Sequence, residues 1–142
     1  MSAPTAIPPT PEVLAAALLF AAEQARTPPA PEYLEVSEDV ARRLVHARSE
    51  GLCERCGSAW ATDWHHRQNR SQGGVWCPSN GLDLCRSCHA DIGQFPTPAY
   101  VAGFLVRRFA IPANQPVRLH LHGWSLLNRD GSVHLLHDRS IL

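Results

Sequence analysis

The chain of 142 residues contains no lysine, and its thirteen arginines are balanced by thirteen acidic residues, so that the formal net charge is zero. A neutral chain lacks the long-range positive field that draws many nucleic-acid-binding proteins to their ligand. If this chain acts on a polyanion, bound metal ions must therefore supply much of the local positive charge.

Long apolar runs are also missing. The longest, VLAAALLFAA at residues 13–22, is too short to span a bilayer. Glu12 precedes it where a secretory leader would carry basic residues. These absences predict a soluble, cytoplasmic protein with no membrane partner.

The pattern along the chain predicts an α+β fold in three parts. Residues 1–36 form an arm rich in proline and alanine, with one helix from about Pro11 to Arg26. This arm is either loosely attached or docked through its apolar face on the body or on another chain. Residues 37–96 form the core, which begins with a helix capped by Ser37, presenting Val40, Leu44 and Val45 on one face and stopped by Gly51.

Residues 97–142 are a C-terminal extension. A short helix is expected over AYVAGFLVRRF, residues 99–109, after the punctuating prolines 96 and 98. Strands are expected at residues 116–122, 123–127 and 132–136, with NRDG forming a turn that ends on Gly131. His120 and His122 on one strand, with His134 and His137 opposite, offer a conceivable second metal site, although an exposed polar strand face is the simpler interpretation.

Four of the five cysteines form two CxxC knuckles, Cys53–Cys56 and Cys85–Cys88, separated by 28 residues. Four thiolates satisfy tetrahedral zinc, and doubled CxxC spacing without a secretory signal indicates metal ligands more strongly than disulfides. We therefore predict one structural Zn²⁺ shared by both knuckles. Cys77 lies outside them and is interpreted as a loop cysteine without a catalytic role.

Two adjacent histidines, His65 and His66, stand between the knuckles, and His89 directly follows the last cysteine. Successive side chains of a strand leave on opposite faces, so the two imidazoles cannot do the same work. One can hold an ion while the other faces a water molecule. A helix that begins near His89 and crosses the strand would bring His89 to His65.

The stretches CERCG, WHHRQNRSQGG and NGLDLCRSCH together resemble the HNH endonuclease family, and in particular the small zinc-ribbon HNH proteins of phages and prophages. The resemblance covers about residues 40–95, and the C-terminal strands are similar to the tail that many of those proteins carry. It implies a ββα-metal core and metal-dependent hydrolysis of DNA, with 5′-phosphate and 3′-hydroxyl ends.

The resemblance assigns a role to each matching position. His66 falls on the general base, Asn80 on the central asparagine, and His65 and His89 on the ligands of a catalytic divalent ion: Ni²⁺, Co²⁺, Mn²⁺ or Mg²⁺. Many relatives have aspartate at the position of His65, so both ligands here are imidazoles. Asn80 is expected to hydrogen-bond the loop or the imidazole of His66.

Arg67 and Arg70 are interpreted as contacts to DNA phosphate, because both flank the expected cleft. Three tryptophans, Trp60, Trp64 and Trp76, are expected to pack around a small core, with one of them available to stack on a base. Two other functions remain open. In the first, the zinc ribbon is only a scaffold that binds nucleic acid or protein without catalysis. In the second, the site is intact but serves a larger machine, such as one that packages phage DNA.

Overall fold

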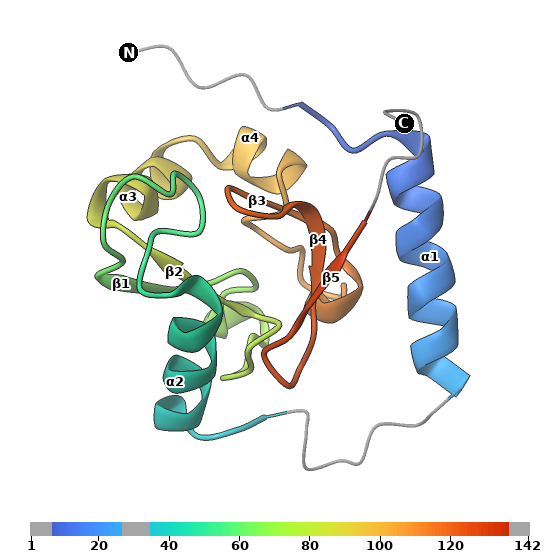
Figure 1. Cartoon of the computed structure of the whole chain (residues 1–142), viewed down its shortest axis with the longest axis horizontal. Coiled ribbons are helices and arrows are strands. Elements are labelled where there is room, and N and C mark those ends of the chain that lie inside the picture. The colour runs from blue at the N-terminus through green and yellow to red at the C-terminus, as the bar shows by residue number, and fades with distance from the viewer. Residues whose placement is uncertain (1–6, 27–34, 137–142) are drawn as a thin grey trace.

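The computed structural model of the protein describes residues 7–26 and 35–136, except for the side chains of residues 24–26. In chain order its elements are α1 (Pro11–Arg26), α2 (Glu38–Ser49), β1 (Asp63–His66), η2 (Arg70–Gln72), β2 (Gly81–Leu84), α3 (Arg86–Gln94), α4 (Pro96–Val101), η3 (Pro112–Asn114), β3 (Val117–Leu119), β4 (Gly123–Leu127) and β5 (Val133–Leu135) (Figure 1). The predicted mixed α and β architecture is confirmed. Among the described residues, none of the helices has the length and apolar character needed to cross a membrane.

The helix α2 has the predicted signals at both ends. The side chain of Ser37 accepts a hydrogen bond from the Val40 amide at 3.3 Å, and acidic residues in the first turn favour the positive end of the helix. At the other end Glu50 and Gly51 adopt positive φ angles of 54° and 79° and stop the helix. Its buried residues are Ala41, Val45 and Ser49, so Val45 of the predicted face is confirmed, whereas Val40 and Leu44 are only partly buried.

The segment from residue 62 to residue 95 forms the predicted two-stranded hairpin followed by a helix. Strands β1 and β2 pair antiparallel, with His65 opposite Leu82 and His66 opposite Gly81. Cys85 caps α3, because its Sγ accepts a hydrogen bond from the Cys88 amide at 3.5 Å. His65 and His66 close β1, and His89 lies in the first half of α3, as predicted.

The C-terminal extension corrects two predicted boundaries. The helix expected over residues 99–109 begins instead at Pro96 and ends at Val101. Gly103 has a φ of 81°, and a Cβ there would lie 1.9 Å from the Pro116 carbonyl, so the chain must turn away from helix at this point. The strand expected at residues 116–122 ends at Leu119, where the amide of His120 instead binds the Glu54 carbonyl at 2.9 Å.

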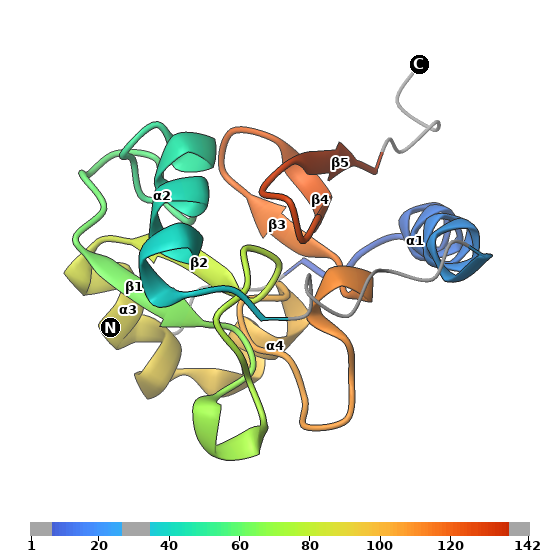
Figure 2. The ribbon, with the colours of Figure 1, turned by 90° about the horizontal axis from the view of Figure 1, so that it is seen from below.

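A second sheet, of order β3-β4-β5, faces the first sheet and α4 (Figures 1 and 2). Its predicted turn is present, since Gly131 has a φ of 92° and its amide binds the Asn128 carbonyl. The main core joins both sheets to α3 and α4, and its most buried apolar side chains are Leu82, Leu84, Ile92, Val117, Leu119 and Leu127.

Helix α1 lies along the outer side of β5 (Figures 1 and 2). Val13 and Ala17 are buried there with Leu126 and Leu136, and Phe20 stacks on His134 with ring centroids 3.9 Å apart. The helical part of the arm is therefore docked on the body of its own chain. Residues 1–6 and 27–34 of the expected arm, and His137, lie outside the described residues.

Candidate functional site

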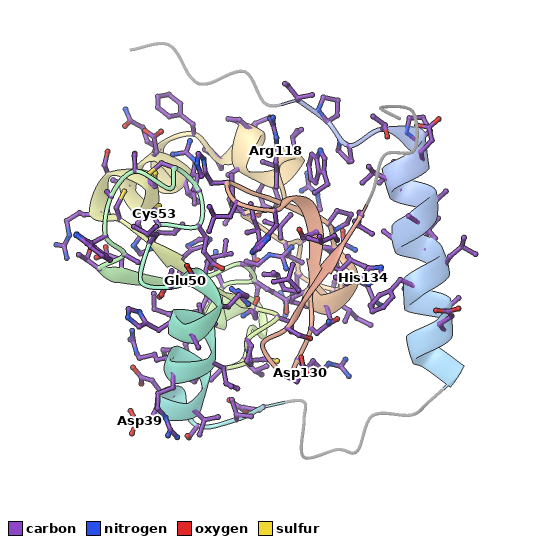
Figure 3. The ribbon with its side chains drawn as sticks, viewed as in Figure 1. Asp39, Glu50, Cys53, Arg118, Asp130 and His134 are labelled. Atoms are coloured by element: carbon purple, nitrogen blue, oxygen red, sulfur yellow. The ribbon has the colours of Figure 1, made fainter. Side chains whose placement is uncertain are left out.

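The two CxxC knuckles converge on one point. Cys53 and Cys56 lie in the loop after α2, and Cys85 and Cys88 lie at the start of α3; Cys53 is seen beside that helix in Figure 3. Their four sulfur atoms all lie within 4.8 Å of one another, and the sulfurs of Cys56 and Cys85 are 4.0 Å apart. Zinc–sulfur bonds of about 2.3 Å in a tetrahedron place sulfurs about 3.8 Å apart. The cluster could therefore hold a structural metal ion, and its all-sulfur donor set fits zinc.

The surroundings of the cluster shift the pKa values of its thiols in different directions. Burial raises the pKa of the Cys53 thiol and that of the Cys88 thiol. Burial acts in the same direction on Cys56, but hydrogen bonds from the side chain and backbone of Ser58 outweigh it and lower the pKa of Cys56 to about 6. The lowered pKa favours the thiolate form of Cys56, which is the form that binds a metal ion.

A buried ion pair holds the first knuckle against the hairpin. Glu54 accepts two hydrogen bonds from Arg48 of α2, at 2.7 and 2.9 Å, and a third from the Asp83 amide of β2 at 2.9 Å. The same guanidinium donates to the carbonyls of Pro78 and Gly81. Helix α2, the knuckle and β2 are thereby joined around one pair of charges whose side chains are 2% and 5% exposed.

On one face of β1, His65 approaches His89 of α3, with ring centroids 5.3 Å apart. Nε2 of His65 donates to the Phe104 carbonyl at 2.7 Å, so the unprotonated nitrogen of this ring is Nδ1. Nδ1 of His89 donates to Asp63 at 3.1 Å, which leaves Nε2 as the nitrogen of this ring that can bind an ion. Burial lowers the pKa of His65 to about 4, which keeps this imidazole neutral.

Asp63 is the residue of this cluster that the sequence interpretation missed. It shares a strand face with His65, two positions away, and this spacing could have indicated it. Its pKa is lowered by hydrogen bonds from His89 and Thr62, with Arg86 adding a favourable charge. A carboxylate or carbonyl on the outer nitrogen is the usual device that orients a metal-binding imidazole, and both rings have one.

The ligand atoms of Asp63, His65 and His89 do not converge closely enough to hold an ion as they stand. Within the described part of the chain, only the four cysteines form a set of three or more potential ligand atoms that all lie within 4.8 Å of one another. Asp63, His65 and His89 do not form such a set, so side-chain rotation would have to bring them to a shared ion. His120, His122 and His134 form no such set either.

His66 leaves the opposite face of β1 and meets a different environment. Its Nδ1 accepts a hydrogen bond from the Trp64 indole at 3.1 Å, and its ring contacts Trp76 with centroids 4.6 Å apart. Nε2 is buried, with no hydrogen-bond partner among the described residues. Burial lowers the pKa of His66, and the charges of Arg70 and Arg42 add to this effect. These shifts favour the neutral ring. The side chain is partly exposed, but its Nε2 is shielded from solvent, whereas the sequence predicted that this imidazole faces a water molecule.

Asn80 fastens the loop that follows β1, which is the first of its two expected roles. Its Oδ1 accepts from the Gln68 amide at 2.7 Å, and its Nδ2 donates to the carbonyls of Gln68 and Val75, each at 3.1 Å. Asn80 is 1% exposed. It therefore acts on His66 only through the loop.

The structure overturns the expected role of Arg67. This side chain is fully buried and donates to four backbone carbonyls, those of Ser79, Gly103, Pro112 and Gln115. Its pKa is lowered by burial to about 9. Every edge of the guanidinium that could meet a phosphate is already used, so Arg67 is a structural residue. Three of these carbonyls belong to the segment 103–115. No sequence pattern marks a segment whose backbone carbonyls will accept hydrogen bonds from a buried arginine.

Arg70 is exposed at the start of η2, and its guanidinium carbon lies 5.8 Å from the Trp76 ring. Its contact with phosphate stays a prediction. Among the tryptophans, Trp64 is 9% exposed and packs as expected, whereas Trp60 is 72% exposed. Cys77 is buried in a loop, 3.2 Å from the Ser79 hydroxyl and outside the four-cysteine cluster.

Comparison with known proteins adds little to this geometry. No family model matches the chain, and no solved structure matches it. An indoleacetamide hydrolase of Allorhizobium ampelinum is 37% identical over 105 residues, which are 69% of this chain and 22% of the hydrolase. The chain thus spans about a fifth of the length of the curated relative that it matches. A similarity of that extent shows neither the family nor the activity of this protein.

Proposed function

We propose that this protein is a metal-dependent DNA endonuclease of the HNH type, with a structural zinc on its four cysteines. The observation that carries the proposal is the imidazole pair on a ββα unit. His65 on the strand and His89 on the helix are in ring contact, and each has its outer nitrogen held by a carbonyl or a carboxylate. This is the arrangement expected of imidazoles that present their remaining nitrogen to an ion.

The residues have separate roles in the proposed hydrolysis. His65 and His89 would hold the divalent ion, with Asp63 orienting His89. When bound, the ion supplies Lewis-acid stabilisation of the charge that develops on the phosphate and on the leaving oxygen. His66 takes a proton from water as the water oxygen attacks phosphorus; the bond to the 3′-oxygen breaks, and that oxygen gains a proton.

The tautomer of His66 sets a condition on this step. Its Nδ1 now accepts the Trp64 N–H, so the ring proton lies on the enclosed Nε2. Nε2 can accept a proton only if the ring proton first moves to Nδ1. A protonated Nδ1 can no longer accept the hydrogen bond from the Trp64 indole, and the two N–H groups would repel each other. The Trp64 hydrogen bond must therefore open when DNA binds.

The same enclosure favours one alternative, a zinc-ribbon module that binds nucleic acid or protein without catalysis. A scaffold has no need for His66 to reach water. Plasmid nicking by the zinc-loaded protein, with each divalent metal added, separates the two functions. The proposal expects nicking by the unmodified protein and its loss in His66→Ala. His122→Ala, an exposed histidine of the second-sheet turn, should keep full activity.

Circular dichroism and zinc content should be unchanged in His66→Ala, because the ring lies outside the cysteine cluster. A His66→Ala protein that nicks at the rate of His122→Ala would show that the base is wrongly assigned. Absence of nicking by the unmodified protein with every metal would favour the binding module.

The identity of the ion can be predicted from its two nitrogen ligands. Imidazole suits cobalt and nickel, and to a lesser degree manganese, better than it suits magnesium, which prefers oxygen. We expect Ni²⁺, Co²⁺ or Mn²⁺ to support nicking at lower concentrations than Mg²⁺. His65→Asp should move the preference towards Mg²⁺. The measurement is a titration of nicking rate with each metal; equal performance of Mg²⁺ in the unmodified protein would refute the ligand assignment but leave the nuclease proposal intact.

Service to a larger DNA-processing machine, such as one that packages phage DNA, is compatible with this proposal. The neutral net charge supports it, since a partner that delivers DNA would replace the missing long-range attraction.

A further inference from the structure

On the face of β1 opposite the His65–His89 pair, the proposed base His66 is surrounded by aromatic rings and guanidiniums that have no part in the proposed proton transfer. Trp64, His66 and Trp76 are in mutual ring contact, with centroids between 4.6 and 5.7 Å apart. Two guanidiniums lie over these rings, Arg42 from α2 and Arg70 from η2. Their Cζ atoms are 5.3 and 5.8 Å from the Trp76 centroid, and Arg42 is also 5.8 Å from that of Trp64.

The packing of these guanidiniums suits them to bind phosphate. A guanidinium stacked over an aromatic ring keeps its N–H edges available, and the ring restricts its motion, so less side-chain entropy is lost when a ligand binds. Arg42 and Arg70 are both exposed. Arg70 takes part in no ion pair among the described residues, and Arg42 has only one, with Glu38.

The Glu38–Arg42 pair is weak and can be exchanged for a ligand. Nε of Arg42 lies 2.9 Å from Glu38, and the two side chains are 48% and 51% exposed. Exposed ion pairs of this kind contribute little to the free energy of folding, because water and salt screen the charges. A phosphodiester can replace Glu38 as the acceptor and take two parallel hydrogen bonds from the guanidinium. Glu38 therefore acts as a local competitor of the phosphate.

We propose that Arg42 and Arg70, which lie over the Trp76 ring, form a clamp for the DNA phosphate backbone next to His66. This inference rests on the proposed function and replaces Arg67 with Arg42 as the partner of Arg70. Because the Trp76 ring contacts both guanidiniums and the His66 ring, a phosphate held by the clamp lies beside the proposed base. It also explains how a neutral chain can hold DNA, through two local cations rather than a long-range field.

The test measures affinity for a fluorescein-labelled DNA duplex by anisotropy, using the full zinc-loaded chain without added divalent metal, over a range of NaCl concentrations. Arg42→Ala and Arg70→Ala should each weaken binding about three- to tenfold near 0.1 M salt. Each should also flatten the slope of log affinity against log salt by about 0.9, as expected for one lost phosphate contact. Arg43→Ala is the matched control, because it is the next residue of α2 and is also exposed.

Two further variants separate the clamp from a merely structural role. Glu38→Gln should tighten binding about twofold or more, since it frees Arg42, whereas a role in packing predicts no gain. Arg42→Lys keeps the charge but loses the planar edges, so it should retain most of the salt slope and bind more weakly than the unmodified protein. Thermal denaturation of every variant checks the fold.

The outcomes distinguish this inference from the nuclease proposal. Variants of Arg42 and Arg70 that bind and nick DNA as Arg43→Ala does would overturn the clamp and leave the nuclease standing. Salt-dependent binding that needs Arg42 and Arg70, with no nicking by any metal, would support the clamp and overturn the nuclease. No binding of the duplex by the unmodified protein at low salt would overturn the clamp.

Discussion

At the scale of single residues, adjacent histidines acquire different properties because they leave opposite faces of one short strand. His65 is 5% exposed and donates to a carbonyl, whereas His66 accepts from an indole. Both pKa values are lowered, chiefly by burial. Both neutral rings carry their proton on Nε2, but this N–H is donated to the Phe104 carbonyl in His65 and has no partner among the described residues in His66.

Acid should destabilise the protein through His65. Its pKa falls from 6.5 to about 4 on folding, so the folded protein binds fewer protons there than the unfolded chain does. The neutral, buried His65 therefore contributes its full share to the free energy of unfolding above about pH 6.5. This share, about 3 kcal/mol, is lost progressively as the pH falls from about 6.5 to about 4. Urea denaturation of the unmodified protein and His65→Gln across this window measures it. Parallel pH curves for the two proteins would contradict the expectation.

The cysteine cluster makes a second prediction at this scale. Cys85→Ser should lower bound zinc and destabilise the core, because binding energy at a structural zinc site is also folding energy. Cys77→Ser is the control: this buried cysteine lies outside the cluster, and within the described part of the chain its side chain makes a polar contact only with the Ser79 hydroxyl. Zinc content and thermal denaturation are the measurements. If Cys85→Ser keeps a full zinc complement, the cluster is not the site of the metal.

At the scale of elements, the Arg48–Glu54 pair decides how α2 meets the ββα unit. Glu54 lies inside the first knuckle, yet its partners come from α2 and β2. The carboxylate therefore joins the first cysteine knuckle to two neighbouring elements. The hairpin that carries His65 and His66 is held in place by the same contacts.

Loss of the Glu54 charge should be costly. Glu54→Gln leaves Arg48 buried without its counterion, and such changes destabilise proteins by about 3 kcal/mol or more. Glu38→Gln, which removes the exposed pair with Arg42 from the same helix, should cost only about 0.5 kcal/mol or less. Chemical denaturation of both variants provides the comparison. Similar losses in the two variants would show that the buried pair contributes no more than the exposed one.

At the scale of the whole molecule, α1 and the second sheet form a separate apolar cluster from the main core. Val13, Ala17, Leu126 and Leu136 make up this cluster, and α1 reaches the rest of the molecule chiefly through it. His134 of β5, near α1 in Figure 3, is used for packing on Phe20 rather than for binding a metal.

Disruption of this apolar cluster should release α1 and leave the four-cysteine cluster unchanged. Val13 is 1% exposed, and Val13→Asp would bury an unpaired carboxylate. We expect faster proteolytic cleavage within residues 11–26 but unchanged zinc content. Leu18→Asp, at a position that is 72% exposed on the same helix, should leave proteolysis unchanged. Equal protection of α1 in all three proteins would show that the helix does not depend on this contact.

The features that can be predicted from the sequence are local. Two CxxC knuckles predict a four-sulfur cluster because each knuckle brings its own pair of sulfurs together, and one closing contact completes the set. Strand alternation separates His65 from His66 whatever surrounds them. Ser37 and Gly51 mark the two ends of α2, because each acts on backbone groups only a few residues away in the chain.

Tertiary structure alone decided which distant groups those residues meet. The carbonyl on His65 comes from Phe104, and the carbonyls that occupy Arg67 come from residues 79 to 115. Backbone carbonyls are present at every residue, so no pattern of side chains distinguishes the ones that a buried arginine will reach. The indoles that enclose His66 and position Arg42 likewise depend on how α2 packs against the hairpin, because the partners of a side chain are set by packing between segments far apart in the chain.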